Sequence, residues 1–256
     1  PTINLFFLKN FLDFFYSFIK VFLLLFSNNK KNTVIIADVL NLSPTIGAFF
    51  ASKIIGVKII CIVTDMPGLD VFKNNIKKII KVNLINFFIR NFNGYILITK
   101  QLNKLVNPTS KPYMIMEGLV DHNMASNNKN IIYKNGKSKI IIYSGGIYKR
   151  YGVDMLINAF IKLNDPNIQL HIYGTGEMEN QMSKYSNIDN RVKYMGVVEN
   201  QILVKAQQDA MLLVNPRPSN EELTKYSFPG KNMEYMVSGT PVLTSKLPGM
   251  PEEYIP

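Results

Sequence analysis

Hydrophobic residues in the first half of the chain form short β-branched runs separated by longer stretches with helical spacing. The short runs read VIIADVL, VKIICIVTD, YILITK and KPYMIMEGLVD and begin at residues 34, 57, 95 and 111. Between them, residues 44–56 and roughly 74–91 place apolar side chains three or four positions apart, which is typical of helices. The short continuous runs are typical of strands buried on both faces. The alternation predicts a parallel sheet covered by helices.

The same alternation returns in the second half of the chain. Apolar runs that end in glycine, proline or polar residues predict strands, and they read KIIIYSGG, IQLHIYGTG, VKYMG, AMLLVNP and TPVLTS. VDMLINAFIKL, from Val153 to Leu163, has the spacing of an amphipathic helix. Residues 122–138 interrupt the pattern with a polar stretch rich in Asn and Lys, which suits a linker.

We therefore predict an α/β protein of two Rossmann-like domains. Residues 1–122 form the first domain, residues 123–138 the linker and residues 139–256 the second domain. Two such domains in tandem are expected to face one another across a cleft, where the carboxyl ends of their strands meet.

The first segment, INLFFLKNFLDFFYSFIKVFLLLF, is long enough to suggest a membrane span. However, Lys9, Asp13, Ser17 and Lys20 recur every three or four residues along it. Charges at the centre of a span cost about 3 kcal/mol each, so an amphipathic helix with a narrow polar stripe fits better. We expect this helix to pack in a globular core; the alternative is a helix that also touches a membrane surface.

Composition narrows the class of partner. Lys and Arg number 29 against 18 Asp and Glu, a net charge of 29 − 18 = +11, which favours anionic partners. The basic residues are scattered and no aromatic-plus-basic motif appears, so we expect no nucleic-acid partner.

Cys61 is the single cysteine and lies in an apolar run, so we expect it to be buried. Two histidines without ligand spacing make a metal site improbable, and a reducing, cytoplasmic compartment is the default.

The stretch YSFPGKNMEYMVSGTPV, from Tyr226 to Val242, carries the strongest candidate chemistry. Pro229 suits the first position of a helix, and Gly239 suits its left-handed end. The unpaired N–H groups of a helix start bind phosphate, Gly230 allows close approach, and Lys231 adds a positive charge. Glu234 follows one turn later, where it could accept hydrogen bonds from a ribose. The alternative is an ordinary surface helix with solvated charges.

Two glycine turns supply further candidates. Gly145 and Gly146 end a strand, and Lys149 and Arg150 follow them, so this turn is a second candidate phosphate site. Three other candidates end strands on the expected ligand-binding side: Gly174, Gly176 and Arg217. For Gly174 and Gly176, a tight connection between a strand and a helix is the simpler interpretation.

Residues 139–256 resemble the donor-binding domain of retaining GT-B glycosyltransferases, family 4-like, in the group that builds capsular and lipopolysaccharide glycans. Four segments carry the resemblance in order: YSGGIYKRYGVDMLINAF, IYGTGE, VNPRPSNEELTKYSFPGKNMEYMVSGTPV and PGMPEEY. The residues before the linker resemble the acceptor-side domain more loosely. The resemblance implies transfer of a sugar from a nucleotide-diphosphate sugar to a glycan or lipid-linked acceptor, with retention and without a metal or cofactor.

The resemblance also assigns roles. Glu234 matches the second glutamate of the family's paired motif, which holds the donor ribose, whereas the position of the first glutamate is Tyr226. The variant FP(S/G)K replaces that region, so the implied donor-binding residues include Ser227, Phe228, Pro229 and Gly230.

Gly230 stands where serine is more common, which leaves recognition of the donor sugar's hydroxyls to be supplied elsewhere, with Glu221 or Glu222 as candidates. Lys149 and Arg150 lie near the family's phosphate-binding basic residues, although the usual lysine is Tyr151 here. Lys149 and Lys231 are expected to stabilise the departing diphosphate electrostatically.

Some parts of the family pattern are missing. The opening strand with its glycine-rich turn and the closing helices have no counterpart, so we expect both domains to be incomplete and the chain to be a piece of a longer enzyme. A non-catalytic nucleotide-binding protein and a sugar-nucleotide epimerase of the same fold are the alternatives. The basic charge and a lipid-linked acceptor imply a cytoplasmic protein in peripheral contact with an anionic membrane, at its inner face.

Overall fold

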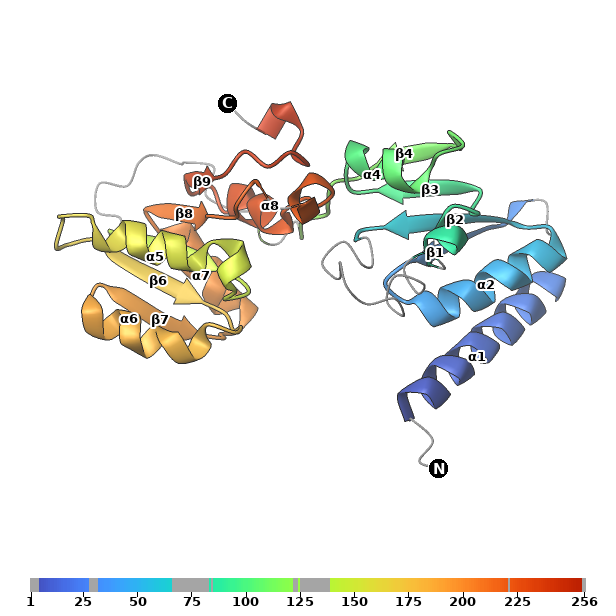
Figure 1. Cartoon of the computed structure of the whole chain (residues 1–256), viewed down its shortest axis with the longest axis horizontal. Coiled ribbons are helices and arrows are strands. Elements are labelled where there is room, and N and C mark those ends of the chain that lie inside the picture. The colour runs from blue at the N-terminus through green and yellow to red at the C-terminus, as the bar shows by residue number, and fades with distance from the viewer. Residues whose placement is uncertain are drawn as a thin grey trace. The chain divides into compact units, whose positions relative to one another are not determined.

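The computed structural model describes residues 5–27, 32–65, 83, 85–121, 124, 139–220 and 222–254. It divides into two compact units, each with its own parallel sheet (Figure 1). The first unit comprises residues 1–117 together with 225–228, and the second comprises residues 118–224 and 229–256. Most of the predicted linker, residues 123 and 125–138, lies outside the described residues.

The first unit is a four-stranded parallel sheet in the order β1-β2-β3-β4. Its elements are α1 (Leu5–Ser27), β1 (Val34–Asp38), α2 (Leu42–Ile55), β2 (Lys58–Val63), β3 (Gly94–Leu97), α4 (Lys100–Val106) and β4 (Tyr113–Ile115). The four predicted strands are therefore confirmed. Of the helix predicted at 74–91, only residue 83 and residues 85–91 are described, and 85–89 are helical.

The core of this unit forms where α2 and the helical residues 85–89 meet the sheet. Phe49, Ile89 and Phe92 are buried there together with strand residues such as Cys61. Cys61 is fully buried, as predicted, and this burial raises the pKa of its thiol to about 12, with a smaller contribution from Asp38. A thiol in this state is a packing residue rather than a nucleophile.

Helix α1 is a single helix, as predicted, but its apolar surface is only partly buried. It lies along α2 (Figure 1). The Ser17 hydroxyl donates a hydrogen bond to the Pro44 carbonyl at 2.7 Å, so part of the polar stripe faces α2. The opposite side, which is also apolar, is exposed, with Ile19 52% and Leu23 62% accessible. The expectation that this helix packs in the core therefore holds for one side only.

The second unit is a five-stranded parallel sheet in the order β7-β6-β5-β8-β9. Its strands are β5 (Ile140–Ser144), β6 (Gln169–Tyr173), β7 (Val192–Gly196), β8 (Leu212–Asn215) and β9 (Val242–Thr244). Its helices are α5 (Val153–Ile161), α6 (Met182–Ile188), α7 (Asn200–Asp209) and α8 (Gly230–Val237), with short 3₁₀ turns η3 (Lys149–Tyr151), η4 (Glu179–Gln181), η5 (Glu222–Lys225) and η6 (Glu252–Tyr254). Each strand predicted in this half is present.

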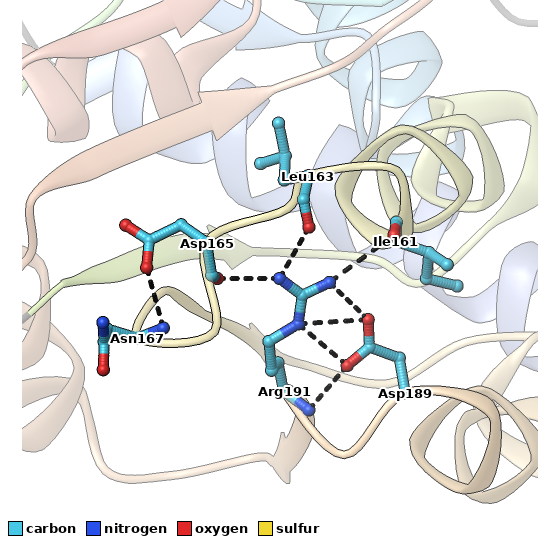
Figure 2. A network of polar contacts seen from close by, with 6 residues as sticks. All are labelled: Ile161, Leu163, Asp165, Asn167, Asp189 and Arg191. Carbon is cyan, nitrogen blue, oxygen red and sulfur yellow. Dashed lines mark hydrogen bonds and ion pairs between the residues drawn. The ribbon is translucent and has the colours of Figure 1, made fainter.

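The half-buried guanidinium of Arg191 holds the end of this sheet where β6 and β7 begin (Figure 2). Arg191 donates to both carboxylate oxygens of Asp189 and to the carbonyl oxygens of Leu163 and Asp165 at 2.7 and 2.8 Å. This hydrogen bonding holds the pKa of Asp189 below its ordinary value. Since Arg191 directly precedes β7, it lies at the amino end of the strands, away from the strand ends that bind ligands in such sheets.

Candidate functional site

Two glycine turns pack against one another at the carboxyl ends of β5 and β6. The Gly145 N–H donates to the Tyr173 carbonyl at 2.9 Å, and the Ile147 N–H donates to the Thr175 carbonyl at 2.9 Å. Gly174 has φ +121°, and a Cβ on it would overlap the Gly145 carbonyl oxygen. Only glycine fits at such a position. The two turns can therefore approach so closely because the residue that follows β6 is glycine.

Lys231 reaches this pair of turns from α8. A Cβ on Gly145 would lie 2.6 Å from Lys231 Nζ, so the lysine side chain runs directly across the glycine. The lysine is half-buried, and burial lowers its pKa while nearby Glu234 partly opposes the shift. Within the part of the chain that the structure describes, Nζ has no hydrogen-bond or ion-pair partner. An incompletely solvated cation of this kind favours an anionic ligand.

A cavity of about 350 Å³ lies beside Lys231. The turns that follow β5, β6 and β7 and helix α7 form its walls: Ser144, Gly145, Gly146, Tyr148, Tyr173, Gly174, Thr175, Gly196, Val197, Val198 and Leu203. In the observed strand order, β5 has β6 on one side and β8 on the other. This reversal point, at the carboxyl ends of the strands, is where open α/β sheets bind ligands.

The start of α8 differs slightly from the prediction. Pro229 is the N-cap, with φ −76°, and the helix begins at Gly230, so Pro229 is not its first helical residue. A Cβ on Gly230 would meet no atom within 4 Å, so the space above this residue is open. No hydrogen bond from the N–H groups of Gly230 or Lys231 is found among the described residues. These two amides are thus available to an anion.

Glu234 lies one turn further along α8 and is half-buried. Its carboxylate has no hydrogen-bond partner among the residues that the structure describes. The end of the helix follows the prediction, because Gly239 is left-handed with φ +72°. The predicted order of an amide-rich helix start, a lysine and a free carboxylate is therefore present on one helix.

A buried hydroxyl attaches α8 to β5. The Ser144 N–H donates to the Tyr235 hydroxyl at 2.9 Å, and that hydroxyl in turn donates to the Ser144 carbonyl at 3.2 Å. Gln207 donates to Ser144 Oγ at 3.1 Å. Tyr235 is fully buried, which raises its pKa to about 12, so the phenol stays neutral. This contact sets the distance between Lys231 and the glycine turn that follows Ser144.

A second buried contact fixes the first turn of α8 to the sheet. Asn232 is fully buried, and its side chain accepts from Asn215 at 2.7 Å and donates to Thr244 Oγ1 at 3.0 Å. Asn215 and Thr244 end β8 and β9. The start of α8 is consequently held at the carboxyl ends of the strands, and neither amide was recognised as important from sequence.

Lys149, which we paired with Lys231 on sequence, lies in different surroundings. It is exposed, its backbone N–H donates to Glu177 Oε1 at 3.0 Å, and it lines a second cavity of about 360 Å³. The other residues of this cavity are Asp154, Glu177, Met178, Gln181 and Tyr185. Gly176, on the neighbouring turn, has a packing role, because a Cβ there would lie 2.5 Å from the Ile147 carbonyl oxygen.

The two predicted arginines share one aromatic ring. The guanidinium carbons of Arg150 and Arg217 lie 5.1 and 5.2 Å from the centre of the Tyr151 ring. Arg150 also lies 5.5 Å from the Tyr148 ring, which meets Tyr151 edge-on. The Tyr151 ring thus holds the positive charges of Arg150 and Arg217 near the turn after β5.

The remaining predicted residues are placed as follows. Ser227 and Phe228 are buried and group with the first unit, whereas Pro229 and α8 belong to the second. Glu221 lies outside the described residues, as does the side chain of Glu222. No group of three or more potential metal-ligating side chains occurs among the described residues.

Sequence reasoning missed much of the cavity wall, including Tyr173, Val197, Val198 and Leu203. One available signal was Gly196, which ends β7 with φ +68° and begins a third strand–turn transition like those at Gly145 and Gly174. The apolar side chains after it carry no chemical signature of their own.

Comparison with solved structures shows that this chain has a GT-B fold. HepE from Anabaena, in a crystal structure with UDP-glucose, superposes with a TM-score of 0.62 at 15% identity, covering 91% of this chain and 64% of HepE. S. aureus TarM gives a TM-score of 0.66 at 17% identity, covering 93% of this chain and 46% of TarM. The lipopolysaccharide outer core galactosyltransferase WaaB gives 0.61 at 17% identity, covering 99% of this chain and 66% of WaaB.

Residues 138–255 match the family described as glycosyl transferases group 1. The match covers the second unit's sheet and the whole candidate site. A comparison with curated protein sequences found no match. The chain spans about two thirds of the length of HepE and less than half of TarM.

Proposed function

We propose that this protein transfers a sugar from a nucleotide-diphosphate sugar to a glycan or lipid-linked acceptor, with retention of configuration and without a metal. The observation that carries the proposal is the position of Lys231 across Gly145, beside a cavity at the ligand-binding end of the sheet. The family match of residues 138–255 and the GT-B fold support it. HepE has been crystallised with UDP and with UDP-glucose, which makes a uridine nucleotide the first donor to test.

In the proposed complex, the donor's diphosphate lies against the glycine turns. Lys231 and the open amides at the start of α8 bind its oxygens, and the backbone of Gly145 and Gly146 allows close approach. Glu234 accepts hydrogen bonds from the ribose hydroxyls. The apolar cavity wall at Val197 and Val198 suits the flat face of a base.

The chemical role of these residues follows from charge. Cleavage of the bond between the anomeric carbon and the diphosphate leaves additional negative charge on the departing phosphate. In the proposed complex, Lys231 and the α8 amides stabilise this charge as it develops. We assign Arg150 and Arg217 supporting roles, since they add positive charge around the turn after β5. Lys149 stays in the proposal as an exposed cation on η3.

The proposal also covers the acceptor substrate and the place in the cell where it is used. A lipid-linked or glycan acceptor would be used at the inner face of the cytoplasmic membrane, and the net charge of +11 favours peripheral contact with anionic lipid.

Calorimetric titration of the full chain with UDP and UDP-glucose tests donor binding. Glu234→Ala should weaken binding by about 1–3 kcal/mol, the range for losing a hydrogen bond to a charged group, which is roughly a five- to 150-fold change. Glu253→Ala, an exposed glutamate on η6, is the matched control and should bind like the parent. Unchanged affinity in a folded Glu234→Ala variant would remove Glu234 from the site.

Turnover is tested separately, with a radiolabelled nucleotide sugar and lipid-linked or glycan acceptors. Transfer supports the proposal, and the anomeric configuration of the product reports retention or inversion. Binding without any transfer would favour the non-catalytic alternative.

A further inference from the structure

A second cavity lies in the unit that carries the candidate donor site, and we call it the polar cavity. Its volume is about 360 Å³, which is within the range of small-molecule sites, about 300–1,000 Å³. None of its lining residues lines the cavity beside Lys231, so it is a separate place for a ligand. Its wall consists of Lys149, Asp154, Glu177, Met178, Gln181 and Tyr185.

Backbone contacts and a buried side chain give the polar cavity a fixed shape. The Met178 N–H donates to the Ile147 carbonyl at 3.1 Å, and the Lys149 N–H donates to Glu177 Oε1 at 3.0 Å. The Met178 side chain is buried in the core of the second unit. Because these contacts join the cavity wall to the core, ordering the wall around a ligand costs little.

The polar side chains of this cavity keep most of their hydrogen-bonding capacity. Among the residues that the structure describes, the Lys149 ammonium, the Asp154 carboxylate and the Gln181 amide have no hydrogen-bond or ion-pair partner. The Tyr185 hydroxyl likewise has none there, and Glu177 uses one carboxylate oxygen for a backbone N–H. Side chains from η3, α5, η4 and α6 therefore bring unused polar groups to one cavity.

The mixture of these groups indicates the class of ligand. The carboxylates of Asp154 and Glu177 repel an anion, whereas the ammonium of Lys149 repels a cation. A hydroxyl group both donates to a carboxylate and accepts from an ammonium, so a neutral ligand with several hydroxyls satisfies both kinds of group. Met178 and the Tyr185 ring add an apolar surface, which suits the C–H face of a sugar ring.

We propose that the polar cavity binds a neutral pyranose ring, either as a free sugar or as one unit of a glycan. Asp154 and Glu177 accept hydrogen bonds from the ring hydroxyls. Lys149 and Gln181 donate hydrogen bonds to other hydroxyls of the same ring. The inference goes beyond the proposed function, because the polar cavity shares no lining residue with the cavity beside Lys231. Its test needs neither a nucleotide nor turnover, so the two proposals fail separately.

Saturation-transfer NMR on the full chain tests the proposal, because this method detects weakly bound ligands. The probes are glucose, galactose, mannose and N-acetylglucosamine, together with maltotetraose and chitotetraose. Saturation should reach the ring protons of at least one of these sugars. Tighter binding of a tetrasaccharide than of its monosaccharide would identify the ligand as a glycan unit, and equal binding would identify a free sugar. Absence of transfer to all six probes would overturn the proposal.

Variants of the cavity wall show where the sugar binds. Asp154→Ala/Gln181→Ala removes an acceptor and a donor and should weaken binding roughly tenfold, the effect of losing two hydrogen bonds. The matched control Glu253→Ala/Gln201→Ala changes an exposed acid and an exposed amide outside the cavity and should bind like the parent. Circular dichroism checks folding, and equal affinities of the two double variants would contradict the assignment.

A milder variant keeps the test valid if the double variant does not fold. Tyr185→Phe removes one hydroxyl from the cavity and keeps the ring, so it should weaken sugar binding by a smaller factor. Unchanged sugar affinity in both Tyr185→Phe and Gln181→Ala would then overturn the proposal.

Salt and charged competitors test the neutrality of the ligand. Sugar affinity should be nearly insensitive to sodium chloride, because screening acts on charged ligands. Inorganic phosphate and spermidine are titrated as an anion and a cation. If either binds the parent and the control but not Asp154→Ala/Gln181→Ala, the polar cavity is a site for a charged ligand and the saccharide assignment is wrong.

Discussion

Removal of one hydroxyl tests how the candidate site is held together. Tyr235→Phe keeps the buried ring and deletes the group that bonds both the N–H and the carbonyl of Ser144. Ser144 is 1% exposed, so water cannot replace the lost partner. The substitution therefore changes hydrogen bonding while leaving packing almost unchanged.

The magnitude follows from the groups that lose a partner. A buried N–H left without an acceptor costs about 1–3 kcal/mol, and the deleted hydroxyl no longer has to be desolvated. We expect a net loss of about 2 kcal/mol in the free energy of unfolding. For a unit of this size, that corresponds to a melting temperature lowered by roughly 5–10 °C.

Urea unfolding followed by circular dichroism measures the loss, and hydrogen exchange of peptides covering β5 locates it. Tyr185→Phe is the matched control, because no hydrogen bond of its hydroxyl is found among the described residues. Protection at Ser144 should fall in Tyr235→Phe and stay unchanged in Tyr185→Phe. If Tyr235→Phe stays within about 0.5 kcal/mol of the parent with full protection at Ser144, the hydroxyl is not what joins α8 to β5.

Three further predictions concern the glycine turns, Lys231 and the ion pair between Asp189 and Arg191. Gly174→Ala should strongly lower the midpoint of urea unfolding, because φ is +121° and the new Cβ meets the neighbouring backbone. Gly230→Ala, where the new Cβ meets no atom within 4 Å, should leave the midpoint almost unchanged. Similar midpoints for the two variants would refute this prediction. The pKa of Lys231 is lowered by burial, so UDP affinity measured by calorimetry should fall as pH rises through a value below the ordinary 10.5. Lys231→Arg should remove that pH dependence, and an unaltered profile would exclude the lysine. Asp189 has a pKa depressed below its ordinary 3.8 by Arg191, so its stabilisation is present above pH 3.8 and is lost as pH falls through the lower folded value. Asp189→Asn should flatten this acid limb of the stability curve, and identical acid limbs would show that the pair contributes nothing.

The elements of both sheets could be predicted from sequence because each carries a local signal. Continuous β-branched runs, helical spacing and glycine at strand ends depend on a few neighbouring residues. The start and end of α8 were predicted to within one residue, the error being the place of Pro229. The positions of Lys231 and Glu234 on α8 could be predicted for the same reason, since helix geometry alone places them one turn apart. Their roles toward a ligand stay a prediction.

The arrangement of distant segments had no such signal. Whether Lys149 or Lys231 lies across Gly145 depends on how η3 and α8 pack on the sheet, and the structure brings only Lys231 there. The stacking of Arg150 and Arg217 on Tyr151 likewise joins residues on different elements.

By itself, the sequence determined the alternation of strands and helices, the glycine turns and the order of functional groups along α8, because these depend on short-range geometry. The tertiary structure alone decided which lysine reaches the cavity, which hydroxyl holds α8 and which side of α1 remains uncovered. Those outcomes depend on contacts between residues far apart in the chain, where burial and hydrogen bonding select one packing among many with the same local pattern.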